Sequence, residues 1–159
     1  MELNNEQTLE MMQYAFTRLD GGWFLAAAKS LGIEQAWQLD VEAWTHFSYV
    51  FGKKVRKDYI PEPVWPDSFV DTLQLFSNVL KIEGREVEVN GSTITVRVTD
   101  CETQKMIAKA GIADCGIVTV QTYYGLIRGL FADEVDVEVV HAKNLNHGDE
   151  CCEVVINEK

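Results

Sequence analysis

Residues 87–98 read VEVNGSTITVRV, and this stretch decides the fold class. Apolar side chains alternate with polar ones on both sides of Asn90-Gly91, which is the period of a strand that buries one face. Asn-Gly accepts the positive φ that a type I′ hairpin turn needs at both central positions. A two-residue loop there predicts that Val89 pairs with Ser92 and Val87 with Ile94. One apolar face then collects Val87, Ile94, Val96 and Val98.

Two further strands are expected over residues 134–141 and 150–156, where valine and isoleucine again alternate with other residues. The alternation places His141 and Cys152 on the same faces as the neighbouring apolar side chains. His141 ends one strand and Cys152 begins the next, so a hairpin would bring them close together. With residues 87–98, these segments predict a four-stranded antiparallel sheet.

The first half of the chain predicts helices. Apolar spacings of three and four indicate helices over about 9–19, 23–31 and 33–57, with a break at Asp20-Gly21-Gly22 and a stop at Gly32. An extended connector containing all three prolines follows over residues 59–67, and Ser68 is expected to cap a helix from Phe69 to about residue 81. Helices over 101–110 and 117–131 complete the pattern.

The whole chain is therefore expected to form one α+β domain over residues 1–159. An N-terminal helical layer (helical half 5–80) would pack with the antiparallel sheet and crossing helices (sheet-containing half 85–157). The 159 residues suffice for one substantial core, and 47% of them are hydrophobic.

The charge balance argues against a polyanionic partner. The net charge is −11, so the chain repels phosphate backbones and anionic membranes, and we expect neither nucleic acid nor membrane as a partner. The basic run over residues 53–57 is better explained as the solvated end of a helix, where cations suit the dipole. No secretory signal or apolar span is evident, which predicts a cytoplasmic protein.

Four cysteines, all after residue 100, indicate where a site would form: Cys101, Cys115, Cys151 and Cys152. In a reducing compartment they are thiols or ligands rather than disulfides. Cys101 follows a strand and Cys115 lies between two helices, so both can meet His141 and Cys152 at one end of the sheet. Thiolate and imidazole are the ligands that zinc prefers, and iron is the alternative. His147 is a substitute ligand or a supporting group.

Two other interpretations of these residues stay open. The chain has no Cys-x-x-Cys pair, so Cys115 and Cys152 would also suit a role as small buried hydrophobes, with His141 as a hydrogen-bonded core histidine. Adjacent Cys151 and Cys152 point to opposite sides of a strand, which would strain a disulfide between them. A redox switch there is disfavoured, because Glu150 and Glu153 flank the pair.

An aromatic group in the helical half has two interpretations as well. Trp23, Phe24 and Trp44 would wall a small-ligand cavity between helices and sheet, or they would belong to the core.

Two stretches of the sequence resemble known families. The segments DGGWFLA at residues 20–26, GIEQA at 32–36 and DVEAW at 40–44 resemble an uncharacterised prokaryotic family similar to L-2-amino-thiazoline-4-carboxylic acid hydrolase. The half running from Arg97 to Cys152 is similar to the 4-vinyl reductase domain. That resemblance implies the α+β ligand-binding fold of nitric-oxide signalling and Golgi-transport domains. It also implies cysteines near the ends of the last two strands, where this chain has His141 and Cys152.

Three roles follow as hypotheses. The first is a cytosolic domain that binds a small ligand or a metal at Cys101, Cys115, His141 and Cys152. The second is a hydrolase of a small cyclic or amide-like metabolite, with the metal activating water and Asp100 or Asp149 nearby. The third is a structural module that forms a homodimer.

Overall fold

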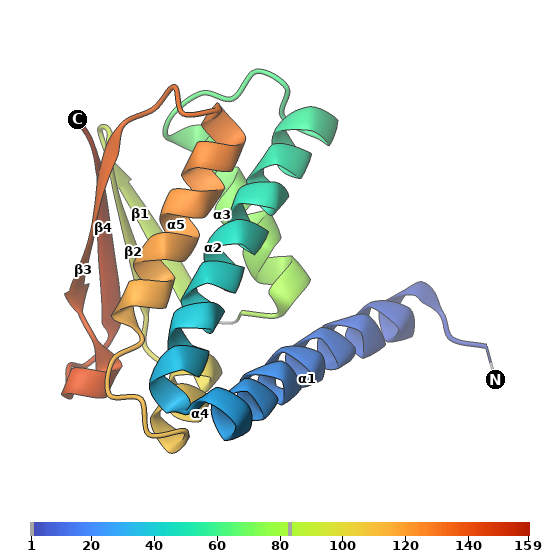
Figure 1. Cartoon of the computed structure of the whole chain (residues 1–159). Coiled ribbons are helices and arrows are strands. Elements are labelled where there is room, and N and C mark those ends of the chain that lie inside the picture. The colour runs from blue at the N-terminus through green and yellow to red at the C-terminus, as the bar shows by residue number, and fades with distance from the viewer. Residues whose placement is uncertain (1, 83) are drawn as a thin grey trace.

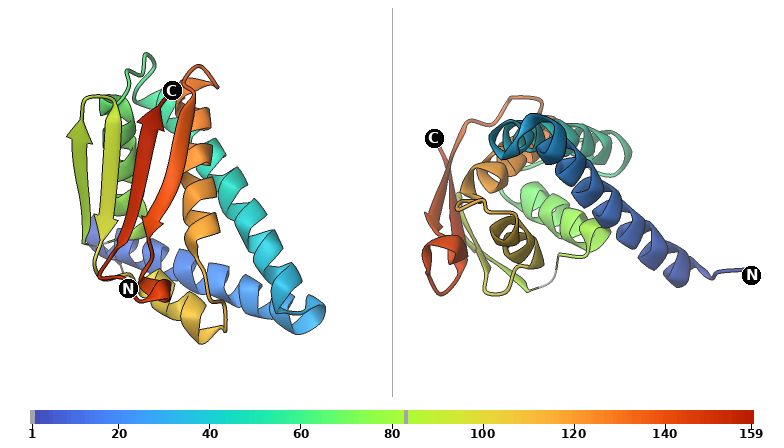
Figure 2. Two further views of the ribbon diagram at one scale, coloured as in Figure 1. Left: turned by 90° about the vertical axis from the view of Figure 1, so that its left-hand side faces the viewer. Right: turned by 60° about the horizontal axis from the view of Figure 1, so that its bottom comes forward.

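The computed structural model describes residues 2–82 and 84–159, and it has the predicted α+β architecture. A four-stranded antiparallel sheet carries helices α3 and α5 on one face, α2 packs on α5, and α1 crosses one end of α2 (Figure 1). Figure 2 shows that the described helices gather on this one face of the sheet. None of the described helices is both long enough and apolar enough to cross a membrane.

Helix α1 (Asn5–Leu31) runs without interruption, so the break predicted at Asp20-Gly21-Gly22 is wrong. A capping box begins the helix, in which the Gln7 amide donates to Asn4 Oδ1 at 2.8 Å. Phe16 and Phe24, on either side of the glycines, contact Trp44 and Trp37 of α2. These contacts hold the helix through a segment where each glycine costs about 1 kcal/mol relative to alanine. Gly32, with φ of 89°, ends α1 as predicted.

Helix α2 (Ile33–Asp58) matches its predicted span, and the proline-containing connector leads to α3 (Asp67–Leu80). Ser68 does not cap α3, contrary to the prediction. The helix begins two residues before the predicted Phe69, at Asp67, and the buried Ser68 hydroxyl accepts a hydrogen bond from the Val64 amide of the connector at 2.8 Å. Its side chain therefore stabilises the turn into the helix.

The hairpin formed by β1 (Arg85–Asn90) and β2 (Thr93–Val98) has a different register from the predicted one. Asn90 pairs with Thr93 and Val87 with Val96, so Gly91-Ser92 is the loop. Gly91 has φ of 62°, whereas Asn90 and Ser92 have no positive φ. Glycine at the first loop position suits a type II′ turn rather than type I′. The shift is two residues, so the predicted apolar face survives.

The remaining strands are β3 (Val137–Lys143) and β4 (Cys152–Glu158), each beginning later than predicted. The sheet order is β1-β2-β4-β3. Strand β3 continues past His141 to Lys143, with an irregularity between these two residues. The predicted alternation is confirmed, because Val137, Val139, Val154 and Ile156 are buried.

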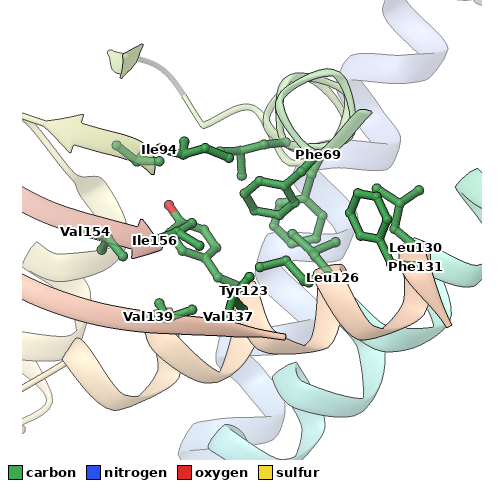
Figure 3. Packing of buried hydrophobic residues seen from close by; sticks show 14 of the residues in the cluster. Phe69, Ile94, Tyr123, Leu126, Leu130, Phe131, Val137, Val139, Val154 and Ile156 are labelled. Carbon is green, nitrogen blue, oxygen red and sulfur yellow. The ribbon is translucent and has the colours of Figure 1, made fainter. Parts of the chain in front are cut away.

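The core lies between the sheet and the helices on its covered face, as Figure 3 shows. Phe69 of α3, Ile94 of β2 and Leu126 of α5 (Gly116–Phe131) are all 0% exposed. Each such side chain contributes roughly 1.5–3 kcal/mol on burial. Glycines let α2 and α5 approach closely, since a Cβ at Gly52 would stand 2.5 Å from the Leu126 carbonyl oxygen. The core contains side chains from both halves of the chain. Its packing holds the start of α5 in place at one end of the sheet.

Candidate functional site

Two of the four predicted ligands begin helices. Cys101 is the N-cap of α4 (Glu102–Lys109), and its sulfur accepts a hydrogen bond from the Gln104 amide at 3.4 Å. Cys115 is the N-cap of α5 and is buried. Thiol groups at helix N-termini lie where the helix dipole favours the thiolate.

The other two predicted ligands lie on adjacent strands. His141 of β3 pairs with Val154 of β4, and Cys152 precedes Val154 by two residues. His141 and Cys152 are therefore diagonal neighbours on one face of the sheet. The Cys152 sulfur also accepts a hydrogen bond from the Leu145 amide at 3.4 Å.

These contacts bring Cys152 together with Cys115 and His141. A hydrogen bond from Cys115 is the largest cause that lowers the pKa of Cys152, to about 4, and the nearby His141 imidazole lowers this pKa further. The same hydrogen bond raises the pKa of Cys115 far above its usual range, and burial adds to that effect. The site thus favours a thiolate at Cys152 beside a thiol at Cys115.

The charge on Cys152 also affects the third predicted sulfur ligand, Cys101. Burial raises the pKa of Cys101, and the charge on Cys152 raises it further, whereas the Arg85 guanidinium lowers it. Arg85 pairs with Val98 at the end of the sheet where Cys152 lies. Its Nη1 donates to Ser77 Oγ at 2.5 Å. Sequence reasoning missed Arg85, because its place at the start of a strand gives no sign of what it faces.

Cys115 has a second acceptor within reach. Its sulfur lies 3.9 Å from Asn144 Oδ1, but one S–H group cannot donate fully to both this oxygen and Cys152. The Cys115 proton therefore has two competing acceptors, Asn144 Oδ1 and the Cys152 sulfur.

His141 is placed by the start of α5. A Cβ atom at Gly116 would stand 2.5 Å from His141 Nδ1, so only glycine leaves room for the imidazole. The Nε2 atom is buried and has no hydrogen-bond partner among the described residues. An unsatisfied buried ring nitrogen costs about 1–3 kcal/mol unless a ligand binds it.

A polar network that the sequence did not predict surrounds the cysteine–histidine group. Asp114 Oδ1 accepts from the Gly116 amide at 2.6 Å and from Asn144 Nδ2 at 2.7 Å. Asp149 accepts from the Asn144 amide at 2.7 Å. Asn144 is only 4% exposed. Asn144 lies in the loop between two strands, where asparagine is common, so no local sequence pattern predicts its role.

A groove opens beside His141. Its volume is about 250 Å³, and its lining includes Asp114, His141, His147 and Asp149. His147 is exposed and lies 3.5 Å from Asp114, so it stands across the groove rather than among the sulfurs. Asp100, the other predicted carboxylate, pairs with Lys105 and does not line this groove.

The arrangement is not a preformed coordination shell. Among residues 2–82 and 84–159, no group of three or more His, Cys, Asp or Glu side chains is spaced as metal ligands are. All four cysteines are free thiols. Cys151 is buried next to Cys152 and takes no part in the contacts described above.

The predicted aromatic pocket is not brought together. Trp23 is 71% exposed on α1, Phe24 contacts Trp37, and Trp44 contacts Phe16 and Phe47. A larger groove of about 470 Å³ lies between α2 and α5, and neither described groove is lined by Trp23, Phe24 or Trp44. Phe24 and Trp44 join α1 to α2 instead, whereas Trp23 stays exposed.

Comparison with known proteins identifies a family. Residues 1–153 match the model of a family of unknown function, DUF6125. No curated protein matches the sequence.

Proposed function

The chain belongs to this family of unknown function, and we propose from its own site that it is a metal-binding domain. In this proposal Cys101, Cys115, His141 and Cys152 hold one zinc ion, or alternatively iron. The observation that carries it is that three elements meet here: His141 and Cys152 are diagonal neighbours on adjacent strands, and the start of α5, which Cys115 caps, packs on the His141 imidazole.

The charge distribution supports a cation at this place. A thiolate at Cys152 opposes ionisation of Cys115 and Cys101, so only one of these three thiols is ionised in the metal-free site. A bound divalent cation reverses this relation, because coordinated thiols lose their protons. The ion would also satisfy the buried Nε2 atom of His141, which has no other partner among the described residues.

Binding requires the donors to close around the ion. The Cys101 and Cys152 sulfurs now accept backbone hydrogen bonds at 3.4 Å, and sulfur is a weak acceptor. Rotation about χ1 of these two side chains is the change that the proposal demands. Asp114 and Asn144, hydrogen-bonded to each other beside Cys115, would support the closed site.

Metal analysis with matched variants tests the proposal. Protein purified in reductant without added metal should carry about one zinc or iron ion per chain. Cys152→Ser should lower this content below about a tenth, whereas Cys151→Ser should leave it unchanged, because Cys151 is the adjacent buried thiol outside the site. Wild-type protein without metal, and with the same stability in chelator, would remove the proposal.

A hydrolase is the second candidate, and the groove is the observation that favours it. The groove joins His141 to the carboxylate of Asp149, so a metal-bound water could face a general base there. The substrate class would be a small cyclic or amide-like metabolite. Zinc-dependent hydrolysis that Asp149→Asn abolishes, with metal content retained, would support this role. A site with all four protein ligands bound would count against it.

A homodimer is the third proposal, and it is independent of the metal. Its support is a helix whose exposed apolar side chains need a partner.

A further inference from the structure

Helix α1 carries large apolar side chains that the rest of the described chain does not cover. It has no buried residue, although Phe16 and Phe24 contact α2. Met12, Leu19 and Trp23 are 66%, 64% and 71% exposed. Figures 1 and 2 show the N-terminal part of α1 projecting away from the sheet and from α5. A surface helix ordinarily turns such side chains inward, so this face indicates an interface.

Three of these exposed side chains share one side of the helix, whereas Met11, Tyr14 and Leu25 are exposed on other sides. Met12, Leu19 and Trp23 follow each other at intervals of seven and four residues, which returns to the same side of an α-helix. We call the residues on this side the uncharged stripe: Thr8, Met12, Ala15, Leu19, Gly22, Trp23, Ala26 and Ser30. None of them is charged. The charged residues of α1 are Glu6, Glu10, Arg18, Asp20 and Lys29, and all of them lie outside the stripe.

We propose that the uncharged stripe is the self-association surface of this protein, where α1 packs antiparallel on α1 of a second copy. Its lack of charge points to a second copy as the occupant. Two identical chains of net charge −11 repel each other over most of their surfaces. A twofold interface presents each group to the same surface of its partner, so charged side chains within it would meet like charges.

The order of large and small residues along the stripe supports the antiparallel arrangement. The stripe runs from Thr8 to Ser30, and Leu19 is its midpoint. With the twofold axis at Leu19, Met12 lies opposite Ala26 of the partner subunit. By the same rule, Trp23 lies opposite the partner's Ala15. Met12 and Trp23 thus each face an alanine, and only Leu19 meets its own copy at the axis, which lets the helices approach. In this arrangement the positive end of each helix dipole also lies beside the negative end of the other, which is favourable.

The area of the stripe is enough for a reversible dimer. Met12, Leu19 and Trp23 together expose roughly 400 Å² per copy, about half of the ~800 Å² per partner of a standard interface. Side chains bordering the stripe would supply the rest. A contact of this size is typical of association at micromolar rather than nanomolar concentration.

Light scattering and sedimentation on the full chain at several concentrations test the proposal. Wild-type protein should be a dimer at tens of micromolar. Leu19→Glu should raise the dissociation constant at least about tenfold, because two carboxylates would meet at the axis. Leu25→Glu is the matched control, since Leu25 is also a leucine of α1, is also 64% exposed and lies off the stripe. It should leave the dissociation constant unchanged.

A charge-pair experiment tests the position of the axis. Mixing Leu19→Glu with Leu19→Lys should restore a heterodimer, because the two charges would face each other. Three results would overturn the proposal: a monomeric wild type, a dimer that tolerates Leu19→Glu, or dissociation by Leu25→Glu instead. Unaltered helix content in circular dichroism shows that each variant is folded. Metal content should not change in any of these variants, so failure here leaves the metal proposal standing.

Discussion

Gly116 leaves the space that the His141 imidazole occupies: a Cβ at position 116 would stand 2.5 Å from His141 Nδ1. Gly116→Ala must therefore displace the imidazole or shift the start of α5. We expect a loss of about 1–3 kcal/mol in the free energy of unfolding, together with weaker metal binding. Urea denaturation and metal titration measure the two effects. Unchanged metal affinity in Gly116→Ala would show that His141 is not a ligand.

At Gly21, substitution by alanine is expected to stabilise the protein, in contrast to Gly116→Ala. It lies inside α1, and a Cβ there would meet no atom within 4 Å. Gly21→Ala should raise the free energy of unfolding by up to about 1 kcal/mol, because alanine favours the helix. Urea denaturation measures this change. Destabilisation by Gly21→Ala would mean that α1 is not continuous at this point.

Cys152 should be the most reactive thiol of the metal-free protein at mildly acidic pH. The hydrogen bond from Cys115 and the His141 imidazole lower its pKa to about 4, whereas the pKa values of Cys101 and Cys115 are raised. Alkylation at pH 6 followed by peptide mapping should modify Cys152 first. Cys115→Ser and His141→Ala should each move the reactivity profile to higher pH. Equal labelling of all four cysteines would contradict the described contacts.

The same shift has a consequence for stability. A folded-state pKa below the unfolded value stabilises the native state at pH values above the unfolded pKa. That contribution falls as pH drops through the interval between the two values, and it is gone below about pH 4. The free energy of unfolding of metal-free wild type, minus that of Cys152→Ser, should therefore increase with pH from 4 to 8. A difference independent of pH would contradict the lowered pKa.

The pKa of Asp40 is shifted upward, in the direction opposite to that of Cys152. Burial, and secondarily the negative charge of Asp20, raises the pKa of Asp40 to about 6. Because the folded pKa exceeds the unfolded value of 3.8, ionisation of Asp40 destabilises the native state as pH rises from about 4 to 6. Asp40→Asn should stabilise the protein at pH 7.5 by roughly 1 kcal/mol after allowance for solvent screening. The gain should vanish near pH 4, and urea denaturation at both pH values measures it.

The sequence predicted what depends on local periodicity. The strand alternation placed His141 and Cys152 on the buried face, and the glycine at 32 ended α1, because both signals lie within a few residues. The break at Gly21-Gly22 was wrong, since contacts of Phe16 and Phe24 with α2 outweigh a weak local preference. The hairpin register was wrong because Asn90-Gly91 and Gly91-Ser92 are both acceptable turns.

The site was predictable only in part, because local periodicity locates the ends of elements but not their long-range contacts. Convergence of Cys115, His141 and Cys152 follows from the ends of their elements, which periodicity locates. The roles of Arg85 and Asn144 depend on long-range packing that no short pattern encodes. Trp23 was expected in a pocket or in the core, yet amphipathic spacing alone does not tell a helix face that meets the core from one that meets a second chain.

X-ray absorption at the zinc and iron edges of freshly purified protein identifies the bound metal and its ligand atoms. The proposed ligands predict three sulfur atoms at about 2.3 Å and one nitrogen at about 2.0 Å around zinc, and the absorption edge tells zinc from iron. His141→Ala should replace the nitrogen by water oxygen, and Cys152→Ser should remove one sulfur. The absence of both edges, or a metal surrounded by oxygen and nitrogen alone, would contradict a site built from Cys101, Cys115, His141 and Cys152.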